Sequence, residues 1–363
     1  MSDYTCIESF CGAGGMAIGL KEAGYTIKAA FDLNEAAVET YTGSIGSEAF
    51  VADASSLSET ELAEHAGLKP GELTLFTGGP PCQGFSKQRR GAHVFEDPRN
   101  QLIRDYIRFV EYLKPKSFIL ENVAVFGQKR GKVYLDELAL ILSDYSLYPN
   151  FYNSADYGVA QTRQRFILVG IRKDFELPYI KPKPTVKEWL TVGEVLKGLP
   201  EPPEDYKVHP EFFNHQRARV TQINIDRFSH VPQGGGWQDI PFDMRLDCHK
   251  KADVKSGGWP DVYGRLKWDG QCPTITGGFD SFTRGRYGHP LKDRPLTPRE
   301  AARLQGFPDY VNFKGPRQEA RYQIGNAVPP PLAKAIGAQI INVLEGDDTV
   351  LEQGDYAAQA QLF

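Results

Sequence analysis

The stretch GGPPCQGFS at residues 78–86 presents one cysteine, Cys82, on a stiff turn with small neighbours. Pro80 and Pro81 fix their φ angles and remove two backbone donors, so the chain approaches the thiol rigidly. The surrounding glycines leave room for a flat ring. A thiol seated in this way suits nucleophilic catalysis, because sulfur is both a strong nucleophile and a tolerable leaving group.

Glu121 and two arginines are further candidates for chemistry. Glu121 ends the apolar run KSFILEN, and ligands of open α/β sheets bind beyond the carboxyl ends of the strands. A glutamate buried among apolar neighbours stays protonated and can act as a general acid. Arg163 and Arg165 begin another apolar run, in QTRQRF, where planar guanidinium groups could hold a carbonyl oxygen. The alternative is a surface pair of arginines at a strand start.

A glycine-rich turn and two aspartates indicate a nucleoside site. Gly12 and Gly14 lie in ESFCGAGG, between an apolar run and a helical pattern, and Asp32 follows Gly12 by 20 residues. A carboxylate there can accept from ribose hydroxyls, and Asp53, after a third apolar run, could accept from an adenine amino group. Ala17 replaces the third glycine of a pyrophosphate site, so S-adenosylmethionine fits better than a dinucleotide. A plain tight turn, and cap or turn roles for the aspartates, are the alternatives.

The elements that must position these residues alternate between strands and helices. Apolar runs at 5–10, 27–32, 73–78, 116–122 and 165–171 predict buried strands, and helical patterns lie between them. This alternation predicts an α/β fold with a doubly wound, Rossmann-like parallel sheet. After about Phe175 proline, glycine and aromatic residues rise and periodicity fades, which predicts a second, smaller irregular domain. The predicted parts are a catalytic domain (1–184), a target-recognition domain (185–319), a helix returning to the catalytic domain (320–345) and an acidic, disordered tail (346–363).

Composition sets wider limits. With 363 residues and 41% of them hydrophobic, the chain can bury a large core. It has no apolar run near the length of a membrane span, so we expect a cytoplasmic protein associated with the nucleoid and no membrane partner. Five of the 46 acidic residues follow Ile341, so the rest of the chain is close to neutral and neither favours nor excludes DNA. Neither disulfides nor a metal site are expected, and four of the five cysteines fit the role of small buried apolar residues: Cys6, Cys11, Cys248 and Cys272.

Six motifs in a fixed order carry a family resemblance. They are FCGAGG, GGPPCQGFS, ENV, QTRQRFILVG, RPLTPREAARLQGFPD and YQIGNAVPPPLAKAIG. In this order they resemble the bacterial type of DNA (cytosine-5) methyltransferases. The resemblance covers nearly the whole chain apart from 185–260 and the tail. It implies a restriction–modification enzyme that acts on double-stranded DNA.

The resemblance also implies residue roles. Cytosine is flipped out of the duplex, because its carbon 5 cannot be reached inside the stack. Cys82 attacks carbon 6, Glu121 protonates nitrogen 3, Arg165 holds the carbonyl and Arg163 supports the pocket. Carbon 5 then takes the methyl group of S-adenosylmethionine. The residues implied for the cofactor site are Phe10, Gly12, Gly14, Asp32, Asp53, Pro80 and Asn326.

Other interpretations stay open beside this one. An RNA methyltransferase shares the fold, but Gly84 and Ser86 favour DNA, and a catalytically silent DNA-binding regulator would not need Cys82 and Glu121. The basic segment 84–100 is interpreted as a lid over DNA, with an ordinary solvated loop as the alternative. Thr297 and Glu300 predict a helix cap that supports the second domain. We expect a monomer.

The last residues suggest one more partner. Gln359, Leu362 and Phe363 form a Q-x-x-L-F pattern that resembles the peptide by which bacterial proteins dock on the replication sliding clamp. The alternative is a frayed terminus without a partner.

Overall fold

The computed structural model describes the chain except for residues 1–2, 47–48, 82–100, 253–260 and 354–363. Cys82, the basic segment 84–100 and the residues of the Q-x-x-L-F pattern therefore lie outside the described residues. The chain forms two compact units. The first comprises 1–157, 164–185 and 328–363, and the second 158–163 and 186–327.

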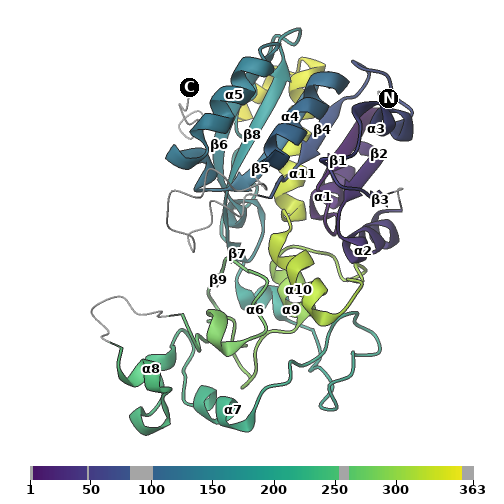
Figure 1. The fold of residues 1–363 in the computed structure, drawn as a ribbon. Helices are drawn as coiled ribbons and strands as arrows, with labels where there is room; N and C mark the ends of the chain where they lie inside the picture. The colour runs from purple at the N-terminus through teal and green to yellow at the C-terminus, as the bar shows by residue number, and fades with distance from the viewer. Residues whose placement is uncertain (1–2, 47–48, 82–100, 253–260, 354–363) are drawn as a thin grey trace. The chain divides into compact units, whose positions relative to one another are not determined.

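The first unit is built on a seven-stranded sheet with the order β3-β2-β1-β4-β5-β8-β6 (Figure 1). Strand β5 is buried along nearly all its length, as expected of a central strand with helices on both faces. The predicted α/β, Rossmann-like fold is confirmed. The strands are β1 (Tyr4–Ser9), β2 (Tyr25–Asp32), β3 (Ala49–Val51), β4 (Leu75–Gly78), β5 (Ser117–Val123), β6 (Tyr145–Asn153) and β8 (Gln164–Arg172).

One strand direction differs from the predicted all-parallel sheet. Strand β8 pairs antiparallel with both β5 and β6. The chain leaves β6 at Asn153 and enters β8 at Gln164, with only a short 3₁₀ turn and the two-residue strand β7 (Gln161–Thr162) between them. A parallel return needs a crossover of a dozen or more residues, usually with a helix, so this short connection reverses the chain. The sequence analysis did not predict β6.

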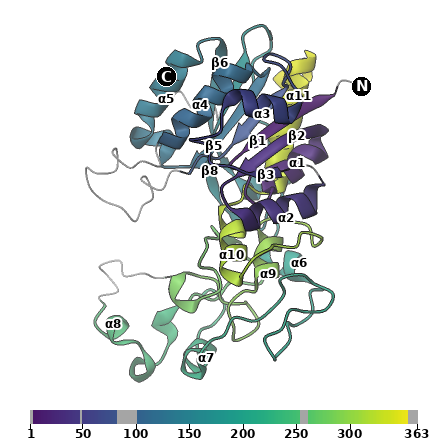
Figure 2. The ribbon, with the colours of Figure 1, turned by 45° about the vertical axis from the view of Figure 1, so that its right-hand side comes forward.

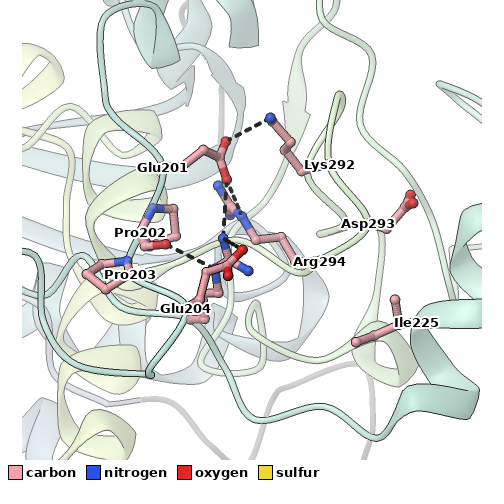
Figure 3. A pocket seen from close by; sticks show the side chains of 9 residues that line it. Glu201, Pro202, Pro203, Glu204, Ile225, Lys292, Asp293 and Arg294 are labelled. Carbon is pink, nitrogen blue, oxygen red and sulfur yellow. Dashed lines mark hydrogen bonds and ion pairs between the residues drawn. The ribbon is translucent and has the colours of Figure 1, made fainter.

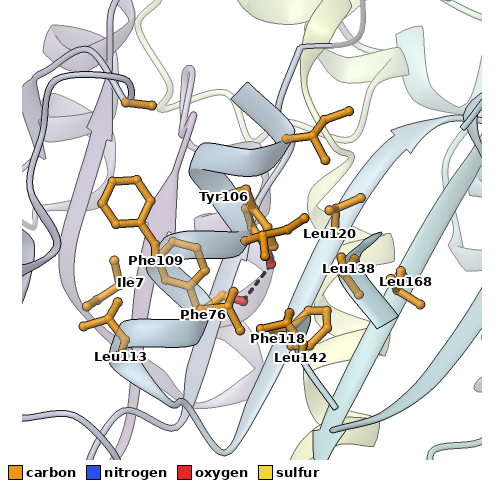
Figure 4. Close-up of a cluster of buried hydrophobic side chains, with 14 of the residues drawn as sticks. Ile7, Phe76, Tyr106, Phe109, Leu113, Phe118, Leu120, Leu138, Leu142 and Leu168 are labelled. Carbon is orange, nitrogen blue, oxygen red and sulfur yellow. Dashed lines mark hydrogen bonds between the residues drawn. The ribbon is translucent and has the colours of Figure 1, made fainter. Parts of the chain in front are cut away.

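Helices cover both faces of this sheet (Figure 2). On one face α4 inserts Tyr106 and Phe109, which pack with Phe76 and Phe118 of the strands (Figure 4). Each fully buried side chain of this size stabilises the fold by about 1.5–3 kcal/mol. On the other face, Tyr25 of β2 donates to the Gly337 carbonyl of α11 at 3.2 Å. The helices are α1 (Gly15–Ala23), α2 (Glu35–Ile45), α3 (Glu59–Ala66), α4 (Gln101–Leu113), α5 (Lys132–Ile141), α11 (Pro330–Glu345) and α12 (Thr349–Gln353).

Helices α1 and α11 approach closely because glycines lie at their contact. A Cβ on Gly19 would come within 2.1 Å of the Pro330 carbonyl oxygen. Of the segment predicted as one helix over 320–345, residues 330–345 form α11, which packs in the first unit, whereas residues 320–326 belong to a separate helix of the second unit. The tail differs from the expected disorder, because Thr349–Gln353 form α12, which packs against α11 and buries Val350.

The second unit has little regular structure. A small core of Phe228, Val231, Trp237, Ile240, Tyr263 and Phe282 lies within it. The unit divides from the first at Thr185 and Ala327, so 158–163 and the helix before Asn326 belong to it, unlike in the predicted division. Its elements are β7 (Gln161–Thr162), α6 (Val192–Leu196), α7 (Gln222–Ser229), α8 (Asp247–Lys250), β9 (Cys272–Pro273), α9 (Pro298–Leu304) and α10 (Arg317–Asn326).

Buried arginines hold the irregular backbone of this unit. Arg265 is 6% exposed, and its guanidinium donates to the carbonyls of Phe228, Val231, His289 and Lys292. Arg299 is fully buried and donates to the carbonyls of Phe213, Pro308 and Val311. Carbonyls that would pair in a helix or sheet are paired with guanidinium groups instead, which meets the requirement that buried backbone groups be satisfied.

The described part of the chain contains no helix both long and apolar enough to cross a membrane.

Candidate active site

Glu121 and Arg165 meet at one edge of the sheet. Arg165 Nε lies 2.9 Å from Glu121 Oε1, and both side chains are largely buried. In the antiparallel register Arg165 pairs with Val123, so Glu121, two residues earlier on β5, shares its face of the sheet and is its diagonal neighbour. The reversed direction of β8 therefore brings the start of one strand beside the end of another. In an all-parallel sheet the two side chains would lie at opposite edges.

The environment of Glu121 differs from the apolar one expected. Its neighbour is a guanidinium group, and a positive charge at this distance favours the carboxylate over the neutral acid. Burial lowers the pKa of Arg165, and the adjacent Glu121 opposes that effect. Glu121 and Arg165 therefore form a largely buried ion pair. The attraction between the two charges compensates for the hydration that each group loses on burial.

The turn that leads to Cys82 is tied to the same strand. Asn122 of β5 donates from Nδ2 to the Pro80 carbonyl at 3.1 Å. A Cβ on Gly79 would lie 3.0 Å from Glu121 Oε2, and one on Gly78 would come within 2.2 Å of Ser9 Oγ. The small residues of this turn thus fit it against β5 and β1. Sequence reasoning missed Asn122, although it stands in the ENV motif beside Glu121.

Arg163 belongs to the second unit, whereas Glu121 and Arg165 belong to the first. It is fully buried, and it donates from Nη1 to the Ile275 carbonyl at 3.0 Å and from Nη2 to the Gly325 carbonyl at 2.9 Å. These contacts join the segment after β9 to the end of α10. They suit a supporting role, and they also fix the backbone next to Asn326, which ends α10.

The glycine-rich turn has the strained backbone that its composition suggests. Phe10 has a φ of 52°, Gly12 of 51° and Gly14 of 79°. A left-handed conformation is uncommon for a bulky residue such as Phe and costs free energy. A Cβ on Gly12 would meet no described atom within 4 Å, whereas one on Gly14 would lie 2.2 Å from Ile45 Cδ1. Gly12 therefore faces open space, and Gly14 is needed for packing.

Asp32 holds this turn in place. Its Oδ2 accepts from the Gly12 amide and its Oδ1 from the Asn34 amide, both at 2.9 Å. Burial raises the pKa of Asp32, and these N–H contacts oppose the shift. Each carboxylate oxygen retains further acceptor capacity. The structure thus brings Asp32 to Gly12.

Asp53 lies just after β3, and its Oδ1 accepts from the Ser55 amide at 2.9 Å. This is the turn role weighed as the alternative for this residue. Two exposed apolar side chains near Asp32 and Asp53 escaped sequence reasoning. Leu33 is 69% exposed and Val51 51% exposed, and the only signal was for Leu33, which directly follows the acidic Asp32.

A buried acid lies beneath the turn. Burial raises the pKa of Glu8 to about 8, the hydrogen bond from Tyr41 opposes the shift and the charge of Asp32 adds to it. The Tyr41 hydroxyl donates to Glu8 Oε2 at 3.0 Å. The thiols of Cys6 and Cys11 also face this carboxyl, and burial raises their pKa values as well. Glu8 is therefore mainly neutral near pH 7.

This shift predicts a pH-dependent stability. Because the pKa of Glu8 is raised in the folded state, its contribution to stability is fully present below the ordinary pKa of 4.5. That contribution is lost as the pH rises through about 8. We expect Glu8→Gln to flatten the fall of the unfolding free energy over this interval, as measured by urea denaturation at several pH values. Glu22→Gln, which changes a half-exposed glutamate of α1, is the control. Equal pH profiles for the two variants would contradict the assignment.

One cavity of the second unit is lined by a network of ion pairs (Figure 3). It measures about 590 Å³. Glu201 forms an ion pair with Lys292 at 3.6 Å, and it accepts from Arg294 Nε at 3.4 Å. Arg294 also forms a paired contact with Glu300 at 2.7 and 2.9 Å. The acidic and basic groups of the cavity neutralise one another, so the cavity offers no surplus charge to a ligand.

Helix α9 behind this cavity has the predicted cap. Thr297 Oγ1 accepts from the Glu300 amide, and the Glu300 carboxylate accepts from the Thr297 amide. The prediction of a reciprocal cap is confirmed. Burial works against ionisation of Glu300, but Arg294 outweighs it and lowers the pKa of Glu300 to about 2.

Comparisons with known proteins agree with this geometry. A sequence model of the family described as C-5 cytosine-specific DNA methylase matches residues 4–342. Type II methyltransferase M.PspPI of Psychrobacter sp. is 34% identical over 94% of this chain and 80% of its own length. Type II methyltransferase M.Sau96I of Staphylococcus aureus is 33% identical over 94% and 76%.

Solved structures give the same result for the fold. A DNA modification methyltransferase encoded within a prophage of E. coli has a TM-score of 0.71 at 26% identity, covering 94% of this chain and all of its own. The Entamoeba histolytica methyltransferase EhMeth has a TM-score of 0.62 at 19% identity, over 96% and 99%, which is a likeness of fold.

Proposed function

This chain belongs to the C-5 cytosine-specific DNA methylase family, and from that membership we propose a complete reaction for it. The enzyme class, DNA (cytosine-5) methyltransferase, and the DNA substrate follow from the family and its relatives. The proposal adds S-adenosylmethionine as methyl donor, a cytosine flipped out of the duplex and a covalent adduct with Cys82. The names of the relatives also favour a modification enzyme of a type II restriction system.

One observation carries the proposal more than any other. Glu121, which forms the ion pair with Arg165 of β8, lies on the strand that also holds the Pro80 carbonyl through Asn122. Pro81 and then Cys82 follow Pro80 directly in the chain. A carboxyl group, a guanidinium and the turn that leads to a thiol are thus fixed by two neighbouring strands.

Each side chain has a task in the proposed reaction. The Cys82 thiolate forms a bond to carbon 6 of the flipped cytosine, and Glu121 delivers a proton to nitrogen 3, which neutralises the charge pushed into the ring. Because Arg165 favours the carboxylate, Glu121 takes up its proton only when the base replaces part of that contact. Arg165 then donates to the cytosine carbonyl, while Arg163 supports the surrounding backbone. After methylation, loss of the proton at carbon 5 restores the double bond and releases the thiolate.

The residues present fit S-adenosylmethionine. When bound, it supplies an electrophilic methyl group. Gly12 faces open space at the end of β1, and Asp32 keeps acceptor capacity for ribose hydroxyls beside it. Phe10, Gly14 and Asp53 would complete the wall, and Pro80 and Asn326 are proposed on the family pattern.

Bisulfite sequencing of DNA from cells that express the protein tests this function. Conversion-resistant cytosines at one short recurrent sequence are the expected result, and they would also give the target. DNA that stays fully convertible, with folded protein present, would overturn the proposal. Methylated RNA with unmethylated DNA would favour the RNA alternative instead.

We propose a monomer whose terminal Gln359, Leu362 and Phe363 dock on the replication sliding clamp. Two apolar side chains would fill a pocket while the glutamine amide binds at its rim, which raises the effective concentration of the enzyme near new DNA. A peptide of residues 350–363 should bind purified clamp in the micromolar range and lose binding with Leu362→Ala and Phe363→Ala. Absence of binding would remove this partner.

A further inference from the structure

Two arginines of α10 share a single carboxylate in the second unit. Arg317 Nε lies 2.7 Å from Asp280 Oδ2, and Arg321 Nη1 lies 2.7 Å from Asp280 Oδ1. Asp280 is 8% exposed, whereas about a fifth of each arginine side chain reaches solvent, at 21%. The cluster therefore carries one surplus positive charge at a partly exposed edge.

Other arginines of this unit have other acidic partners. Arg294 pairs with Glu300 and Arg286 with Asp261, whereas Arg303 and Arg299 share Asp309. Arg163 and Arg299 are fully buried, and their guanidinium groups donate to backbone carbonyls. In the Asp280 cluster, Arg317 Nη1 donates to the Gln216 carbonyl at 2.9 Å, and the buried atoms Arg317 Nη2 and Arg321 Nε have no hydrogen-bond acceptor among the described residues.

The surroundings of the cluster would admit a nucleic-acid backbone. Gly277 and Gly278 precede Asp280 by a few residues and carry no side chains. The ring of Tyr322, 43% exposed, covers Gly277, and the stem of the exposed Arg284 lies against Gly278. A further cation and a tyrosine ring thus lie at the two glycines that precede Asp280 in the chain.

We propose that Arg317 and Arg321, oriented by Asp280, form a seat for one backbone phosphate of duplex DNA. A partly exposed pair of guanidinium groups with a surplus charge suits a phosphate diester, which accepts several hydrogen bonds and carries one negative charge. The contact carries no sequence information, so it sets affinity and register while other residues read the bases. The inference rests on the proposed function in that the ligand is the DNA substrate.

Arg321→Gln tests the seat cleanly. It leaves Asp280 paired with Arg317 alone, so the remaining pair is neutral and we expect the fold to persist, as checked by thermal unfolding. Affinity for a 30-base-pair duplex, followed by fluorescence anisotropy against KCl concentration, should fall for all sequences alike. The slope of log K against log [KCl] should become shallower by roughly 0.9. When KCl is raised from about 50 to about 200 mM, the fold loss of affinity should therefore be roughly threefold to fourfold smaller for the variant than for wild type.

Arg172→Gln is the matched control. It removes the same charge from a surface arginine paired with Asp174, at the far end of β8 from Arg165, and should keep the wild-type slope. A folded Arg321→Gln protein with the wild-type slope would overturn the seat, and so would a change in the methylated sequence at unchanged slope. Failure of the wild type to methylate DNA would instead count against the proposed function, so the two failures are distinguishable.

Discussion

A Cys82→Ser protein is expected to bind duplex DNA like wild type and to transfer no measurable methyl group. A hydroxyl is far less ionised than a thiol at neutral pH, so it cannot attack carbon 6 at a useful rate. Loss of a nucleophile lowers kcat by several orders of magnitude, on the order of 10⁶ where it has been measured in another enzyme. The other described thiols cannot substitute for it in the core, because burial raises the pKa values of Cys6, Cys11 and Cys272.

Trapping on DNA that contains 5-fluorocytosine measures this step directly. Fluorine replaces the hydrogen that must leave carbon 5, so the adduct persists and migrates as one protein–DNA species. Wild type and a Cys248→Ser control, which alters an exposed cysteine, should both give the adduct. An adduct formed equally well by Cys82→Ser would show that the nucleophile is another residue.

Glu121→Gln should lower the rate of methyl transfer by about 10²–10⁴-fold, the usual contribution of a general acid. The amide keeps the shape of the carboxyl group, and its oxygen can still accept from Arg165 Nε. It cannot deliver a proton to nitrogen 3, so the negative charge pushed into the ring is left without compensation. The effect should appear in the rate constant of methyl transfer, measured under single-turnover conditions.

Glu137→Gln provides the comparison. Glu137 also pairs with an arginine through Nε at 2.9 Å, but this pair, with Arg104, is more exposed and joins α5 to α4. The same chemical change there should leave transfer close to wild type. Near wild-type turnover in Glu121→Gln would remove Glu121 from the mechanism.

The sequence predicted most of the first unit, because its strands and helices have regular periodicity. The runs around Ile7, Phe31, Phe76 and Phe118 are short and mainly apolar, as buried strands are. The direction of β8 was not predictable from its own residues, which are equally apolar in either direction. It follows from the length of the connection after β6, a strand rich in tyrosine and asparagine that shows no clear alternation.

That one direction also decides part of the site. We expected a parallel sheet in which Glu121 ends one strand and Arg165 begins another. In such a sheet the two residues would lie at opposite edges. The antiparallel pairing brings them to 2.9 Å. The partner of Glu121 is thus an ion rather than an apolar wall, which could not be read from the sequence because the contact depends on cross-strand register.

The second unit resisted sequence reasoning for a different reason. Its local signals were few, and the cap formed by Thr297 and Glu300 was recognisable because it lies within four consecutive positions. Arg163, in contrast, contacts carbonyls at 275 and 325. No local sequence pattern indicates that a side chain will bind the backbone of distant segments.

The buried arginines of the second unit affect how freely the sequence of this unit can vary. Arg265 and Arg299 bind carbonyl oxygens, and every amino acid supplies the same carbonyl whatever its side chain. Segments fastened in this manner can exchange nearly all their side chains and still find the same anchors. The architecture thereby separates the contacts that support a segment from the side chains that the segment exposes, so exposed residues can be substituted while the buried frame stays unchanged.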